Sequence, residues 1–275
     1  MFQRLMRARP TKPGEIYGVP GQGDSLIISL ISALALFLLW SLATGLGWVK
    51  PLFLPSPLSV FNTLVTLTTD GFAGATLFEH TWVSVLRVFG AFALAAAIGI
   101  PLGLAMGMNR IIRGIFDPPI EFYRPIPPLA YLPLMIIWFG IGELSKVLLI
   151  FLSILAPLAL GTRSGVRSAA IEQIHAAYSM GATRWQVLFQ VILPAAMPEI
   201  LTSMRIGIGF GWTTLVAAEM VAATHGLGYM VLTASQFLQT PIVILGIIII
   251  AVIAYAFDLL MRSLEWRLVP WKGKM

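Results

Sequence analysis

The chain alternates between long apolar runs and short polar interruptions, and this alternation predicts a bundle of membrane-spanning helices. The first run, residues 25–49, has no charged side chain, and a helix of this length crosses about 30 Å of hydrocarbon. The expected fold class is therefore an all-α membrane protein with about six transmembrane helices. The predicted spans are residues 25–49, 88–109, 125–142, 147–162, 205–224 and 237–260.

Glycine and proline mark two of these runs. The second run contains Gly99, Gly103 and Gly107 at four-residue intervals, which predicts a groove on one helix face where another helix approaches closely. Pro101 predicts a kink in the same helix. The third run holds four prolines, whose freed carbonyl groups need protein or water partners, so we expect it to be interior or to line a cavity.

The longest polar stretch, residues 163–199, predicts a helix, a sharp turn and a second helix in water beside the membrane. Ser168 is the predicted N-cap of the first helix, because the apolar positions after it recur at helical spacing. Gly181 is expected to end that helix, since glycine adopts the left-handed conformation at low cost.

The second helix of this hairpin is expected to start at Thr183, which with Gln186 matches a capping box. Pro194 and Pro198 lack a backbone N–H, so we expect them to end the helix. The hairpin exposes an apolar stripe, which calls for a partner.

Two shorter polar stretches complete the pattern. Residues 110–124 are interpreted as a short charged loop. Ser56 and Pro57 form a good helix start, and the apolar spacing after them predicts an amphipathic helix in the membrane interface.

Composition supports a membrane location. The 275 residues are 58% hydrophobic and only 11% charged, whereas soluble domains carry about 25% charged residues. Because so few charges cannot solvate the whole surface, most of it is expected to face lipid. The chain has no cysteine, which excludes disulfides and cysteine-ligated metals.

The basic residues predict the topology. With six spans, 15 of the 18 Lys and Arg residues lie on one side of the membrane. The exceptions are Lys50, Arg87 and Lys146. The positive-inside rule then places both termini and the 163–199 loop in the cytoplasm. Residues 1–24 read as a cytoplasmic basic tail, and residues 25–275 as a single transmembrane domain. Since topology explains the net charge of +6, no nucleic-acid partner is expected.

The sequence lacks the motifs of an energy-converting or hydrolytic enzyme. It contains no phosphate-binding P-loop, no His-Glu-x-x-His zinc motif and no Gly-x-Ser-x-Gly nucleophile elbow. We therefore expect no catalytic residue, no metal site and no cofactor on this chain. Any ATP hydrolysis that drives transport must be on another polypeptide.

One acid lies well inside an apolar run. Placing Glu219 at the centre of a span costs about 2.5–3.5 kcal/mol on insertion scales, so its side chain is expected to face protein or water. Two roles stay open, a part in the translocation pathway or gating, and a structural carboxylate bonded to nearby backbone or hydroxyl groups. Tyr131, Trp138 and Trp212 are further pathway candidates. Asp258 and Arg262 are expected to form an i,i+4 ion pair.

The polar hairpin carries a resemblance to a known family. Ala176-Ala177, then Gly181, then Leu193-Pro194 resembles the cytoplasmic signature loop of permeases of ATP-binding cassette (ABC) importers. His175 stands where that family has Glu, and Val191 where it has Ile. Because His175 has no carboxylate, a salt bridge that the family's Glu makes cannot be assumed in this chain.

The resemblance implies a type I ABC importer permease fold, in which this loop carries the coupling helix. The implied partners are a second copy of the chain, a cytoplasmic ATPase dimer that holds ATP and Mg²⁺, and an extracytoplasmic substrate-binding protein. The residues implied to contact the ATPase are Ala176, Ala177, Gly181, Ala182, Thr183, Arg184, Leu193 and Pro194.

Two other segments narrow the resemblance. Residues 124–134 and 211–219 resemble permeases that import nitrate, sulfonates and taurine, and within that group the taurine permeases. This implies uptake of taurine or a related sulfonate across the bacterial inner membrane by alternating access. Nitrate, bicarbonate, alkanesulfonate or a pyrimidine precursor are alternative cargoes. A secondary transporter or channel and an intramembrane enzyme are the rival classes.

Overall fold

The computed structural model describes residues 26–269, which form two compact units divided after Phe61. The predicted basic tail, residues 1–24, lies outside the described residues. The first unit contains α2 (Leu26–Gly45) and the start of α3 (Pro57–Thr69). Trp40 Nε1 donates to Pro55 O at 3.0 Å, and Ser56 Oγ accepts from the Ser59 N–H, which confirms the predicted helix start.

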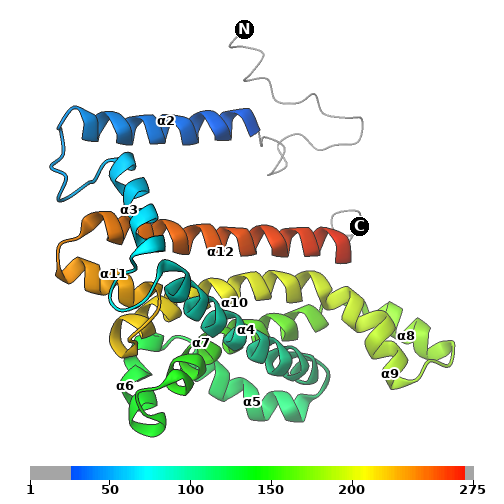
Figure 1. The fold of residues 1–275 in the computed structure, drawn as a ribbon. Coiled ribbons are helices and arrows are strands. Elements are labelled where there is room, and N and C mark those ends of the chain that lie inside the picture. Colours follow the sequence, from blue (N-terminus) through cyan, green and yellow to red (C-terminus); the bar gives the residue numbers. More distant parts are fainter. Residues whose placement is uncertain (1–25, 270–275) are drawn as a thin grey trace. The chain divides into compact units, whose positions relative to one another are not determined.

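The secondary-structure elements described in the second unit are helices (Figure 1). Its helices after α3 are α4 (Leu77–Met108), α5 (Arg110–Tyr123), α6 (Pro128–Phe139), α7 (Glu143–Val166), α8 (Ile171–Ser179), α9 (Arg184–Val187), the π-helix η1 (Leu188–Ile192), α10 (Leu193–Ala222), α11 (Leu227–Gln236) and α12 (Thr240–Leu268).

The core of this unit is built on α7, along which both α4 and α10 pack. Small residues bring the helices together: a Cβ on Gly103 of α4 would lie 2.5 Å from Ala159 O, and one on Gly107 would lie 2.5 Å from Val166 Cβ. The predicted glycine groove is thus the surface that receives α7. On the other side of α7, Gly161 lies directly against Ser203 of α10.

A single hydrophobic cluster joins these three helices to α12. It contains Val88, Ile154, Trp212 and Phe257, one residue from each of the four helices. The predicted Asp258–Arg262 pair is present at 2.7 Å, and Arg205 of α10 also donates to Asp258, at 2.9 Å. Both apolar packing and charge therefore fix α12 to α10.

Within residues 26–269, five helical stretches are long and apolar enough to cross a membrane, and α6 is the exception among the predicted spans. Only 12 residues long, α6 is preceded by a proline and ends where Gly140 adopts a φ of 78°. The proline-rich run therefore forms a short apolar helix in place of a full span.

Three local predictions were wrong. Residues 110–123 form a helix, α5, because the Asn109 side chain accepts from the N–H groups of Ile111 and Ile112. Ser168 does not cap α8; its hydroxyl donates to the carbonyl groups of Gly165 and Ala195 and so ties the end of α7 to the start of α10.

Pro194 and Pro198 do not end a helix. Residues 184–222 form one helical stretch of 39 residues, with Pro194 in the first turn of α10 and Pro198 in the turn after it. The π-helix just before Pro194 accounts for this, since the Leu193 N–H donates to Leu188 O and the backbone shifts register there.

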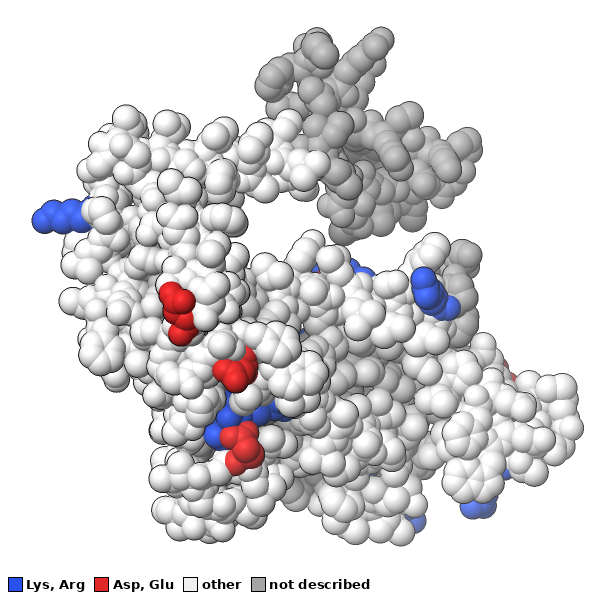
Figure 2. All heavy atoms as spheres, viewed as in Figure 1, with Lys and Arg blue, Asp and Glu red and all other residues white. Residues whose placement is uncertain are grey.

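Charged side chains are sparse on the surface. On the face in Figure 2, most exposed atoms belong to uncharged residues, as expected of a lipid-facing bundle. Several of the charges that are present form ion pairs between helices, as Arg163 of α7 does with Asp117 of α5.

Candidate functional site

The first candidate site is the hairpin formed by α8, α9 and η1, which projects from one end of the second unit (Figure 1). Gly181 has a φ of 86°, the predicted left-handed turn. The Ala182 N–H donates to Ala177 O at 3.0 Å and the Gly181 N–H to Tyr178 O at 2.9 Å, the two bonds of a Schellman cap. The predicted capping box of Thr183 and Gln186 is also present.

The hairpin has one packed side and one free side. Its packed side buries Ala177, Val187, Leu188 and Ile192 against Val166 at the end of α7. The free side exposes large apolar side chains: Met180 is 82% exposed, Trp185 70% and Phe189 58%. The Trp185 and Phe189 rings stack with centroids 6.0 Å apart. An exposed apolar patch of this kind marks the hairpin as a candidate binding surface.

The structure places the predicted coupling residues along this hairpin. Gly181, Thr183 and Arg184 form the turn and the first residue of α9, and all three are exposed. Ala176 is exposed and Ala177 is buried, while Ala182 packs at the edge of the hairpin core. Leu193 and Pro194 start α10. The His175 side chain is exposed on α8.

A second candidate site, a buried polar cluster, surrounds Glu219 near the end of α10. Glu219 is 0% exposed. Its carboxylate accepts from Ser84 Oγ at 2.7 and 2.9 Å, from Arg87 Nη1 at 2.7 Å and from the Gly228 N–H at 2.8 Å. Its partners come from α4 and from the start of α11.

Arg87 connects this carboxylate to a second one. Its side chain, 5% exposed, donates through Nε and Nη2 to both oxygens of Glu143 at 2.6 Å each, and through Nη1 to His225 O at 2.7 Å. Lys146 Nζ donates to Glu143 at 2.7 Å. Two of the three bases predicted outside the cytoplasm are thus held in ion pairs, and the cluster joins α4, α7, α10 and the α10–α11 loop.

Comparisons with known proteins identify the family. The sequence profile of the family described as "binding-protein-dependent transport system inner membrane component" matches residues 99–270, well over half of the chain. The chain belongs to this family. It is thus a membrane transport component, a permease and not an enzyme, and the resemblance found in the signature loop is confirmed.

The names of the relatives of this permease refer to several different substrates. It is 53% identical over 244 residues to the taurine transport system permease protein TauC of Escherichia coli, covering 88% of each chain. It is 36% identical to a putative aliphatic sulfonates transport permease protein SsuC of Bacillus subtilis, over 86% of this chain and 84% of that one. It is 30% identical to the bicarbonate transport system permease protein CmpB of Synechococcus elongatus, over 88% of each.

Solved structures confirm the expected fold. The permease matches a chain of the MetNI methionine ABC transporter in an inward-facing conformation with a TM-score of 0.55 and 20% identity. The match covers 68% of this chain and 95% of that one. It shows a shared permease fold of the ABC importer type.

The aromatic pathway candidates of the permease lie in three settings. Trp212 is 6% exposed within the core, where it packs edge-on against Phe89. Trp138 is 62% exposed near the end of α6, and Tyr131 packs partly buried beside Leu132 in the same helix. Trp212 thus belongs to the cluster that joins α4, α7, α10 and α12, and Tyr131 packs against a separate cluster that contains Ala218, the residue before Glu219.

Sequence reasoning missed the partners of Glu219. Ser84 and Arg87 are spaced i and i+3, which places them on one face of a helix, and this spacing was the available signal. Arg87 was used only as one of the basic residues that predict the membrane topology. Its pairing with Glu143 joins residues 56 positions apart, which periodicity within one element does not reveal.

Proposed function

We propose that this chain is the permease subunit of an ABC importer for taurine or a closely related sulfonate. The observation that carries the substrate is the 53% identity to the taurine permease of Escherichia coli over 88% of both chains. Aliphatic sulfonates are the second candidate, because a relative at 36% identity bears that name. Bicarbonate is a weaker candidate, because the relative that bears that name is 30% identical.

The hairpin is the proposed contact with a cytoplasmic ATPase dimer, which would hold ATP and Mg²⁺. Its rigid turn at Gly181 and its exposed Met180, Trp185 and Phe189 give a partner a firm apolar surface to grip. Of the proposed coupling residues, Ala176, Gly181, Thr183 and Arg184 are exposed on the hairpin and Ala182 is half-buried, whereas Ala177 lies on its packed side and Leu193 and Pro194 start α10. Movement of the hairpin passes directly into α10, because residues 184–222 form one helical stretch.

The remaining partners follow from the family. We propose a homodimer of permeases that receives cargo from an extracytoplasmic binding protein, with both termini and the hairpin in the cytoplasm. The basic-residue distribution supports this orientation. The hairpin and the Glu219 cluster are then at cytoplasmic and extracytoplasmic ends, respectively. For Tyr131, Trp138 and Trp212 a pathway role stays a prediction.

Growth on taurine tests the function. The permease is expressed together with the ATPase and the binding protein of a taurine importer in a bacterium that lacks its own taurine importer. We expect growth on taurine as the sole sulfur source, ATP-dependent uptake of labelled taurine, and unchanged growth on sulfate. Uptake of an alkanesulfonate but not taurine would favour the second candidate, and uptake that persists without the ATPase would refute the importer.

A further inference from the structure

The start of α11 is capped by side chains from other helices. Its N-cap residue, Gly226, has no side chain to satisfy the first N–H groups of the helix. Three consecutive N–H groups instead donate to distant side chains: Gly226 to His80 Nδ1 at 3.0 Å, Leu227 to Ser84 Oγ at 2.8 Å, and Gly228 to Glu219 Oε2 at 2.8 Å. We call these three side chains the remote cap.

The remote cap is fully buried. His80, Ser84 and Glu219 are each 0% exposed, so their hydrogen bonds do not compete with water. Two of them occupy successive turns of α4, and the third comes from α10. The start of α11, whose N-cap glycine has no capping side chain, is therefore fixed to α4 and α10.

Glycine is required where the loop meets the acid. Gly226 has a φ of 131°, and a Cβ on it would lie 2.5 Å from the carboxyl carbon of Glu219. A Cβ on Gly228 would lie 2.7 Å from Val216 O. The backbone thus approaches the carboxylate more closely than any side chain would allow.

The acid must be a carboxylate in this position. One oxygen of Glu219 faces Arg87 Nη1 and the other faces the Gly228 N–H, and the Ser84 hydroxyl donates toward both. The neighbours of both oxygens are donors. An amide would place its NH₂ group against one of them, so glutamine cannot reproduce the bonds although it matches the size.

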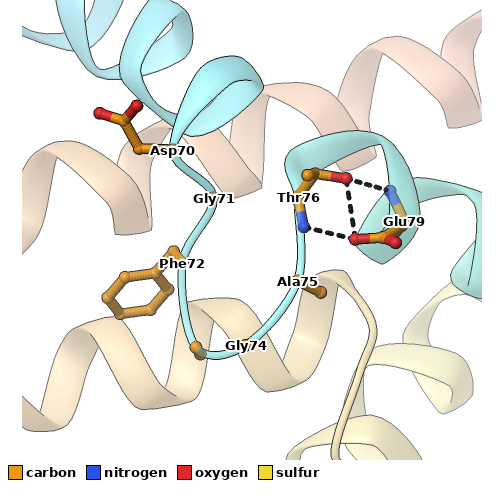
Figure 3. A pocket seen from close by; sticks show the side chains of 8 residues that line it. Asp70, Gly71, Phe72, Gly74, Ala75, Thr76 and Glu79 are labelled. Atoms are coloured by element: carbon orange, nitrogen blue, oxygen red, sulfur yellow. Dashed lines mark hydrogen bonds between the residues drawn. The ribbon is translucent and has the colours of Figure 1, made fainter.

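The cap also reaches the loop before α4. Because the Gly226 N–H can only donate, His80 Nδ1 accepts, and the ring proton is on Nε2, which lies 2.9 Å from Phe72 O. Figure 3 shows that loop, with Phe72 and Ala75 on facing arms and the Thr76–Glu79 bonds that start α4. The loop before α4, α4, the end of α10 and the start of α11 therefore form one bonded assembly.

We infer that His80, Ser84 and Glu219 are positioning residues for transport, which make the start of α11 move together with α4 and α10. This inference rests on the proposed importer function. The α11 helix packs on α12 and α10, and the cap bonds its first residues to α4 as well, so without the cap the start of α11 would no longer be fixed to α4. Motion that the hairpin passes into α10 would then rearrange this end of the permease incompletely, while ATP hydrolysis at the other end continues.

The test measures taurine uptake and ATP hydrolysis on the same purified complex, reconstituted with the ATPase and the binding protein. For Glu219→Gln and Ser84→Ala we expect the ratio of taurine imported to ATP hydrolysed to fall at least fivefold. ATPase activity per assembled complex should stay within twofold of the unmodified protein. Glu219→Asp keeps a carboxylate and should recover part of the ratio that Glu219→Gln loses.

Matched controls use the same changes outside the cap. Asp70→Asn removes an exposed acid, and Ser235→Ala removes an exposed hydroxyl on α11, so both should keep the normal ratio. A normal ratio in Glu219→Gln, or a proportional fall of uptake and hydrolysis in every cap variant, would overturn the inference. If Glu219→Gln does not assemble, the milder Ser84→Ala decides. No ATP-driven sulfonate uptake by the unmodified complex would instead refute the proposed function.

Discussion

Replacing Gly103 by alanine should destabilise the permease at the contact between α4 and α7. The added Cβ would lie 2.5 Å from the backbone oxygen of Ala159 and 2.5 Å from Thr162 Cβ. Ordinary carbon contacts are about 3.5–4.0 Å, so the two helices would have to separate by roughly 1 Å. Neither neighbour is the flexible end of a long side chain.

The size of the effect follows from two opposing terms. Overpacking a well-packed contact costs about 1–3 kcal/mol, and Gly→Ala in a helix returns up to about 1 kcal/mol of helix propensity. We therefore expect a net loss of about 1–2 kcal/mol. For a chain of this size that corresponds to a fall of about 2–8 °C in the unfolding midpoint.

Two glycines on the same helix serve as controls. Gly90 has open space around its Cβ position, so Gly90→Ala should leave the midpoint unchanged or raise it. Gly99 meets only side-chain atoms of Leu155 and Leu158, at 3.2–3.5 Å, so Gly99→Ala should fall between the two. Thermal unfolding of the purified variants in one detergent measures the order. If Gly103→Ala is as stable as Gly90→Ala, the described α4–α7 contact is wrong.

Three further predictions concern the hairpin and its orientation. Gly181→Asp should weaken co-purification with the ATPase, because a side chain at a φ of 86° costs about 1 kcal/mol and a charge enters the proposed contact. Gly181→Asn adds no charge and should have a milder effect. Equal retention of the ATPase by both variants and the unmodified chain would contradict this prediction. Trp185 is 70% exposed, so Trp185→Ala should leave the unfolding midpoint of the isolated permease unchanged. The same change should reduce the affinity for the ATPase about 30-fold, a hot-spot loss of about 2 kcal/mol. Unchanged affinity would show that Trp185 is not part of the contact. Because the chain has no native cysteine, Met180→Cys should react with an impermeant maleimide only from the cytoplasm and His225→Cys only from outside, and the reverse pattern would invert the topology.

Local sequence rules predicted the hairpin turn and the glycine groove well. Gly181 and the Thr183 capping box depend on contacts within six residues, so the sequence alone specifies them. The spacing of Gly99, Gly103 and Gly107 needs only the helix repeat to place all three on one face. These features are encoded in single elements.

The errors arose where one signal overrode another. Pro194 is a helix breaker by propensity, but the π-helix before it changes the register and lets the helix continue. Residues 110–123 were interpreted as a loop because of their charges, and the cap supplied by Asn109 was overlooked. In both cases a neighbouring residue or turn supplied the hydrogen bonds or the change of register that allows a helix to form.

The surroundings of Glu219 could not be predicted from the sequence. Its partners Ser84 and Arg87 are more than 130 positions away, and only the packing of α4 against α10 brings them together. The sequence showed that a buried acid needs partners, but not which ones. The structure supplies them from the same chain, which favours the structural role over a direct part in cargo passage.

Because this chain contains no phosphate-binding P-loop, we propose that a separate ATPase drives transport through the hairpin. Taurine uptake into proteoliposomes tests it most directly, with the permease alone, with the ATPase, and with the ATPase and binding protein together. We expect uptake only when ATP, the ATPase and the binding protein are all present. Uptake at full rate by the permease alone would contradict it.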